Sequence, residues 1–129
     1  MSENAMTGQS ALSWFEIPTT DFDRARNFYE TVLAVTLHEP PFGDRKLAVF
    51  PFTPPGVGGC LAGNSSWAPG AGGCVVYLAV PGALDPVLAR VEQAGGRIVI
   101  SKESLPQGMG WVAHIIDPEG NRVGLRSSS

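Results

Sequence analysis

One order of predicted elements occurs twice along the chain, at an offset of about sixty residues. An apolar segment at residues 12–18 precedes a helix predicted over residues 21–34, whose apolar side chains recur at three- and four-residue spacing. The same order begins again at residues 74–80 and continues into a helical pattern over residues 84–94. Two similar units of this kind must bury their apolar faces against each other or against a partner chain.

Three short predicted strands follow each helix. They are Val35–Glu39, Lys46–Phe52 and Val57–Ala62 in the first unit, and Arg97–Ser101, Gly110–Ile116 and Asn121–Arg126 in the second. The sequence therefore predicts an α+β fold of two βαβββ repeats, residues 12–62 and 74–126, within one domain of residues 10–127. Residues 1–9 are expected to be a disordered lead-in. In each unit the helix covers the outer face of a curled sheet, and the concave inner face is the natural ligand surface.

Composition and charge exclude several classes of partner. The chain has 129 residues, enough for one domain with a real core, and a formal net charge of −3. It has no run of Lys or Arg, which argues against nucleic acid and anionic membranes as partners. No apolar run is long enough to span a bilayer. Cys60 and Cys74 are expected to be two buried thiols in a reducing cytosol, and the protein is expected to be cytoplasmic.

Two separated segments carry a resemblance to a known superfamily. The segment FEIPTTDFDRARNFYETVL, residues 15–33, resembles the opening strand and helix of the vicinal oxygen chelate superfamily, and DPEGNRVGL, residues 117–125, resembles its final hairpin. The resemblance extends over residues 12–126 and implies the glyoxalase/bleomycin resistance/dihydroxybiphenyl dioxygenase fold. Members include glyoxalase I, extradiol dioxygenases and metal-free bleomycin-binding proteins, so the function must be argued from the site itself.

The resemblance also implies where a metal would be held in the metal-dependent members. The four positions fall on Trp14, on or beside Gly59, Cys60 or Leu61, on Val75, and on Gly124. None of these residues is His, Asp or Glu, which supply the imidazole and oxygen ligands of divalent ions in such sites. A lone Cys60 thiolate would lack the partners it needs. We therefore predict no metal and no cofactor.

Strand alternation predicts which side chains face the concave surface. The candidate ligand-binding residues are Trp14, Tyr77, Arg126 and Trp111, and the candidate catalytic residues are Glu16 and His114. Each has a plainer interpretation. Trp14 can belong to the core, and Glu16 can form a structural ion pair with Arg126 or Arg122. His114 can be a hydrogen-bonded strand residue.

Two functions follow as hypotheses. The first is a metal-free protein of the bleomycin-resistance type that binds a small organic molecule, with a bulky and partly cationic aromatic compound as the expected ligand. The second is a glyoxalase-like lyase or isomerase acting on a small carbonyl compound, or a dioxygenase-related enzyme, with Glu16 or His114 as general base. In either case a homodimer is expected, because two-fold pairs are the commonest oligomers.

Overall fold

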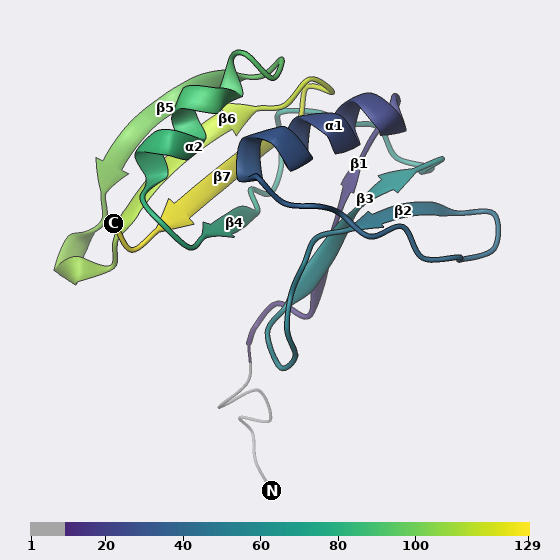
Figure 1. Ribbon diagram of the computed structural model, residues 1–129, viewed down its shortest axis with the longest axis horizontal. Helices are drawn as coiled ribbons and strands as arrows, with labels where there is room; N and C mark the ends of the chain where they lie inside the picture. Colours follow the sequence, from purple (N-terminus) through teal and green to yellow (C-terminus); the bar gives the residue numbers. More distant parts are fainter. Residues whose placement is uncertain (1–9) are drawn as a thin grey trace, which may run out of the picture.

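Two β-sheets lie beside each other under a pair of helices in the structure, a computed structural model that describes residues 10–129 (Figure 1). The first sheet has the order β1 (Trp14–Pro18), β3 (Gly58–Gly63), β2 (Lys46–Val49). The second has the order β4 (Tyr77–Val80), β7 (Arg122–Ser127), β6 (Trp111–Ile116), β5 (Arg97–Ser104). The helices are α1 (Phe22–Leu33) and α2 (Leu84–Val91), and a short 3-10 helix spans Pro106–Gly108. The predicted lead-in at residues 1–9 lies outside the described residues.

The three strands of the first sheet, β1-β3-β2, are arranged like β4-β7-β6 of the second sheet, which has β5 in addition. In each sheet the first strand of the repeat runs parallel to the last strand, so β1 pairs with β3 and β4 pairs with β7. Each last strand then pairs with an antiparallel neighbour. The α+β fold of two repeats predicted from the sequence is therefore confirmed. No helix within residues 10–129 is long and apolar enough to cross a membrane.

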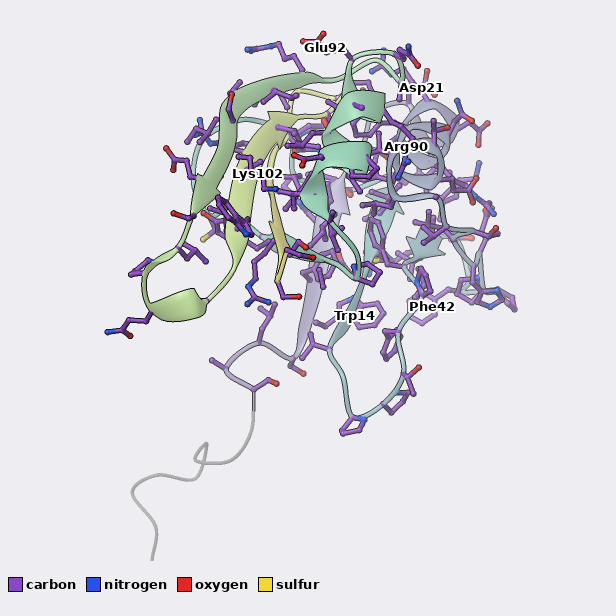
Figure 2. The ribbon with its side chains drawn as sticks, turned by 60° about the vertical axis from the view of Figure 1, so that its left-hand side comes forward. Trp14, Asp21, Phe42, Arg90, Glu92 and Lys102 are labelled. Atoms are coloured by element: carbon purple, nitrogen blue, oxygen red, sulfur yellow. The ribbon has the colours of Figure 1, made fainter. Side chains whose placement is uncertain are left out.

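Helix α1 begins and ends close to the predicted positions because both of its caps are local. The side chain of Asp21 accepts a hydrogen bond from the backbone N–H of Arg24 at 3.1 Å, as an N-cap residue does. Ala34 ends the helix in the left-handed region, with φ 56°. Arg90 of α2 donates to the backbone carbonyl of Val32 at 3.0 Å and joins the two helices (Figure 2).

One predicted strand is wrong. Of the segment Val35–Glu39, only His38 forms a bridge, to β2. The reason lies in α1: Glu30 accepts the backbone N–H of Leu37 at 2.9 Å, and Arg26 donates to its carbonyl at 2.8 Å. These side chains satisfy backbone groups that a neighbouring strand would otherwise satisfy.

Strand bounds differ elsewhere by a few residues. The strand predicted at Cys74–Val80 begins only at Tyr77. The chain joins the sheet just before that residue, where the carbonyl of Val76 accepts the N–H of Gly124 at 2.9 Å. Strand β2 stops at Val49 instead of continuing to residue 52, and β5 continues to residue 104 instead of stopping at 101.

The β6–β7 turn joins the two repeats. The hydroxyl of Tyr29 in α1 donates to Asp117 at 2.7 Å, and both groups are buried. The side-chain amide of Asn121 donates to the carbonyl of Pro18 at the end of β1, at 2.9 Å. These long-range bonds hold the end of β1 against the start of β7. The candidate site lies along this seam.

Candidate functional site

The first strand has one face in the core and one face on the concave side, as strand alternation predicted. Ile17 is buried in the main core, and Phe15 packs against the same core beneath the helices. Trp14 and Glu16 therefore point to the opposite face. Cys60, the residue beside Glu16 on β3, lies in a separate small cluster on that face.

An aromatic residue lies opposite a glycine at equivalent places in the two sheets. Trp14 pairs with Gly58, and Tyr77 pairs with Gly124. Both aromatic side chains are largely exposed, Trp14 at 40% and Tyr77 at 48%. The repeat thus relates Trp14 to Tyr77. This corrects the sequence-based mapping onto Val75, which lies before β4 begins.

The ring of Tyr77 explains why Gly124 has no side chain. A Cβ atom built on Gly124 would lie 2.3 Å from the Tyr77 ring, closer than real Cβ contacts. In the first sheet the ring of Phe52 lies over Gly58 in the same manner and meets Trp14 edge-on at 5.9 Å between centroids. At both places an aromatic ring occupies the space that a longer side chain on the last strand would fill.

Three polar side chains on the open face of the second sheet form a cluster, which we call the Arg122 cluster: Tyr77, His114 and Arg122. The Tyr77 hydroxyl lies 2.6 Å from Nε2 of His114. On the other side of the imidazole ring, Nε of Arg122 donates to Nδ1 at 2.9 Å. Tyr77 and His114 are both predicted site residues, and the structure brings them together.

The bond from Arg122 fixes the tautomer of His114. A guanidinium group can only donate, so Nδ1 accepts and the proton of the neutral ring is on Nε2. Burial lowers the pKa of His114, the charge of Arg122 lowers it further, and Glu103 opposes this. His114 is therefore neutral at pH 7, with both ring nitrogens engaged in hydrogen bonds.

A cavity of about 320 Å³ lies along the seam between the repeats, and we call it the seam cavity. Its walls come from β1, from the glycine-rich loop at residues 67–74 and from the start of β7. The lining residues are Glu16, Ile17, Pro18, Trp67, Ala68, Gly70, Gly72, Cys74, Val76, Asn121, Arg122 and Val123. A carboxylate, an indole and a guanidinium group thus face one small space.

Glu16 does not pair with either arginine considered from the sequence. Its carboxylate lies 3.1 Å from Nη2 of Arg45, which follows the β-bridge turn before β2. Within residues 10–129, no carboxylate lies within ion-pair distance of Arg122. The negative charge of Glu16 is therefore compensated by Arg45, whereas the positive charge of Arg122 has no ion-pair partner among these residues.

Of the six predicted site residues only Glu16 lines this cavity, and Arg126 and Trp111 are engaged elsewhere. The guanidinium group of Arg126 donates to the backbone carbonyl of Met109 at 3.1 Å. The ring of Trp111 is covered by Lys102, whose Nζ lies 4.7 Å from the ring centroid. In Figure 2, Lys102 on β5 and Trp14 on β1 lie at separate places. The structure therefore does not bring Arg126 and Trp111 together with Glu16.

A second and larger cavity, of about 570 Å³, lies between the end of α1 and the strands β1, β3 and β4. We call it the apolar cavity. It is lined by Leu12, Phe15, Leu33, Ala34, Val35, Phe50, Pro51, Val57, Gly58, Gly59, Val76, Tyr77, Leu78, Ala79, Val80 and Pro81. No charged side chain lines it, and Tyr77 is the one lining residue with a polar side chain, so it offers volume with few groups to orient a ligand.

Two residues that line the seam cavity, Arg122 and Trp67, were not among the predicted site residues. Arg122 was considered only as a possible partner for Glu16. Trp67 lies in the glycine-rich loop, whose place beside β1 depends on the tertiary fold. The ion pair of Arg45 joins positions 29 residues apart, and no local pattern in the sequence indicates it.

The donor set does not fit the divalent metal of the superfamily. Within the part of the chain that the structure describes, no group of three or more His, Cys, Asp or Glu side chains gathers as a metal site would require. Of the two thiols expected to be buried, Cys74 is exposed and Cys60 is fully buried. Burial followed by the charge of Glu16 raises the pKa of the Cys60 thiol to about 11. A protonated thiol is a poor metal ligand.

Comparisons with known proteins give the family context of this arrangement. The model of the bleomycin resistance protein-like N-terminal family matches residues 12–50. Among curated proteins, no sequence matches the chain. A hypothetical protein from S. aureus is similar in structure, with a TM-score of 0.68 and 20% identity over 95% of this chain and 97% of that chain.

Two further solved structures carry descriptive names. A glyoxalase/bleomycin resistance protein from Albidiferax ferrireducens has a TM-score of 0.64 and 18% identity, over 92% of this chain and 98% of that chain. A glyoxalase I mutant from Zea mays has a TM-score of 0.68 and 21% identity over 91% of this chain. The match covers 46% of the maize chain, so the present chain spans about half its length.

These structural likenesses establish the fold, and the match at residues 12–50 places a bleomycin-resistance-like sequence in the first repeat. The resemblance stated from the sequence is confirmed at that level: the chain has the fold of the vicinal oxygen chelate superfamily, the glyoxalase/bleomycin resistance/dioxygenase type.

Proposed function

We propose that the protein binds a small organic molecule in the seam cavity and does so without a divalent metal. The observation that carries this proposal is the convergence of Glu16, Trp67 and Arg122 on one space of about 320 Å³. Ligand pockets characteristically combine apolar or aromatic walls with a few polar groups that fix orientation. The seam cavity has both, whereas the apolar cavity has no charged side chain and Tyr77 as its one polar side chain.

The geometry favours binding over catalysis. Glu16 is held in an ion pair with Arg45, and both ring nitrogens of His114 are hydrogen-bonded. A general base needs a free lone pair within reach of the substrate proton. His114 has no free lone pair in this arrangement, and the carboxylate of Glu16 is already bound to Arg45 through one of its two oxygens. The dioxygenase-related alternative has no metal-ligand set to support it within residues 10–129.

The proposal includes a homodimer. Large apolar side chains, two on strands and five in the segments between elements, remain exposed at 40% or more of their surface: Leu12, Trp14, Phe42, Phe52, Trp67, Tyr77 and Met109. Soluble monomers rarely expose many such groups together, and a two-fold partner would cover them. The cytoplasmic location expected from the sequence stays a prediction.

A fragment screen observed by protein NMR tests the proposed function. The ¹⁵N-labelled protein, kept in EDTA, is titrated with small aromatic and carbonyl compounds. We expect hits to shift the amide signals of Glu16, Cys74 and Arg122, and to retain their affinity in the chelator. Hits confined to the apolar cavity, or hits that need an added transition metal, would contradict the proposal.

A pair of variants adds a control to this screen. Trp67→Ala removes the indole that lines the cavity and should weaken a hit by about 1–3 kcal/mol, through lost apolar contact. Phe42→Ala removes an exposed aromatic side chain that lines neither cavity. It should leave the affinity unchanged. Equal losses in the two variants would remove Trp67 from the site.

A further inference from the structure

We infer that the ligand of the seam cavity carries a carboxylate group, which the guanidinium fork of Arg122 binds. This inference rests on the proposed function and names the chemical class of its ligand: a small aromatic carboxylic acid. It departs from the sequence-based expectation of a cationic aromatic compound. The polar groups of the site that the protein leaves without partners are donors that suit such a ligand.

Arg122 is oriented but not neutralised. Its Nε is committed to His114 at 2.9 Å, which fixes one edge of the planar group. Within residues 10–129 its Nη atoms have no hydrogen-bond acceptor, and no ion pair forms with any carboxylate. The side chain is only partly exposed and lines the seam cavity. A held, uncompensated guanidinium group presents parallel N–H donors, the geometry that a carboxylate accepts.

The rest of the Arg122 cluster also presents a donor. Because Nδ1 of His114 accepts from Arg122, its Nε2 carries the proton and donates to the Tyr77 oxygen. The hydrogen of the Tyr77 hydroxyl is then free to point to the open face of the sheet. The cluster therefore keeps two kinds of unengaged donor, the Nη–H groups of Arg122, which lines the seam cavity, and the hydroxyl of Tyr77 beside it. These donors suit a ligand with acceptor atoms.

Among the described residues, Glu16 is the only carboxylate that lines the cavity, and it does not make the cavity suited to a cation. Glu16 is paired with Arg45 at 3.1 Å, so a cationic ligand would have to compete with a guanidinium group already in place. An anionic ligand on Arg122 displaces nothing. The indole of Trp67 lines the same space and supplies a surface for an aromatic ring.

Three probes of one shape and different charge test the inference: benzoate, benzamide and benzylammonium. Each is titrated into the full-length protein at low salt, and the ring signals of His114 and the Nε–H signal of Arg122 are followed by NMR. We expect benzoate to bind about tenfold or more tightly than benzamide, because a charge-assisted bond to arginine is stronger than a neutral one. Benzylammonium should bind no better than benzamide.

His114 provides a second readout that a merely apolar contact would not change. The groups that face its ring are Arg122 from β7, Tyr77 from β4 and Glu103 from β5. A carboxylate bound to Arg122 offsets the positive charge that disfavours protonation of the ring. Saturating benzoate should therefore raise the pKa of His114, and benzamide should leave it where it was.

A matched pair of variants completes the test. Arg122→Gln should reduce benzoate binding to the level of benzamide, whereas Arg97→Gln, the same charge change at an exposed site on β5, should not. The inference is overturned if benzoate has no advantage over benzamide, if the advantage survives in Arg122→Gln, or if benzylammonium binds best. In each of these results an aromatic probe still binds, so the proposed function stands. Absence of binding by all three probes counts against both.

Discussion

At the scale of single residues, Tyr77 packs against Gly124, the position at which metal-dependent relatives would carry a carboxylate. The resemblance places a carboxylate of metal-dependent relatives at this position, yet a Cβ atom there would meet the Tyr77 ring at 2.3 Å. One substitution cannot restore the carboxylate, because the ring must move first. The aromatic surface on the second sheet and the absence of this metal ligand are therefore one structural feature.

This arrangement predicts a specific loss of stability. Gly124→Ala should lower the free energy of unfolding by about 1–3 kcal/mol, because the added methyl group overpacks the contact with Tyr77. Chemical denaturation measures the change. Gly82→Ala is the control, since nothing lies within 4 Å of a Cβ atom there. In the double variant Gly124→Ala, Tyr77→Ala, the loss of unfolding free energy should be smaller than the sum of the losses in the two single variants. Strict additivity would mean that the two residues do not interact.

At the scale of elements, the β6–β7 turn supplies an N-terminal anchor for α1. The carboxylate of Glu119 accepts from the Thr20 hydroxyl at 2.6 Å, from the N–H of Asp21 at 3.1 Å and from Nε of Arg24 at 3.1 Å. Burial opposes ionisation of this group, but the hydrogen bonds from Thr20, Arg24 and Asp21 outweigh it. They lower its pKa from 4.5 to about 2. An anionic acceptor at a helix N-terminus also suits the helix dipole.

The lowered pKa of Glu119 predicts how stability depends on pH. A group whose pKa is lower in the folded state stabilises the fold above its unfolded pKa, and this contribution is lost as the pH falls. We expect a loss of about 1–3 kcal/mol between pH 4.5 and 2, measured by denaturation at each pH. Glu119→Gln should remove this part of the pH dependence. Glu92→Gln, an exposed site at the end of α2 (Figure 2), should retain it. Identical pH profiles for the two variants would refute the assignment.

The elements that sequence predicted well are those whose determinants are local. Helix α1 follows from its apolar periodicity and from the cap at Asp21, which the chain supplies within a few residues. The strand expected at residues 35–39 failed because helix side chains take the backbone groups of Leu37. The partner of Glu16 is Arg45 rather than a residue of β7, because the chain between β1 and β2 folds back beside it. Such choices among several arginines depend on tertiary geometry, which periodicity does not encode.

At the scale of the whole molecule, the exposed aromatic side chains of both sheets predict self-association. Light scattering at micromolar concentration should return twice the chain mass of 13.6 kDa. Trp14→Glu would place a charge among these apolar groups and should shift the equilibrium toward the single chain. Lys102→Glu, a charge change on β5, is the control (Figure 2). A mass near 13.6 kDa for the unmodified protein would show that these faces remain uncovered in solution.

The central claim is that a small molecule occupies the seam cavity without a metal. A crystal structure of the protein soaked with benzoate, collected with anomalous data, tests it most directly. The account predicts the carboxylate on the guanidinium group of Arg122, the ring against Trp67, and no anomalous peak near Trp14 or Gly124. Benzoate held in the apolar cavity, or bound to a metal ion between the two sheets, would contradict it.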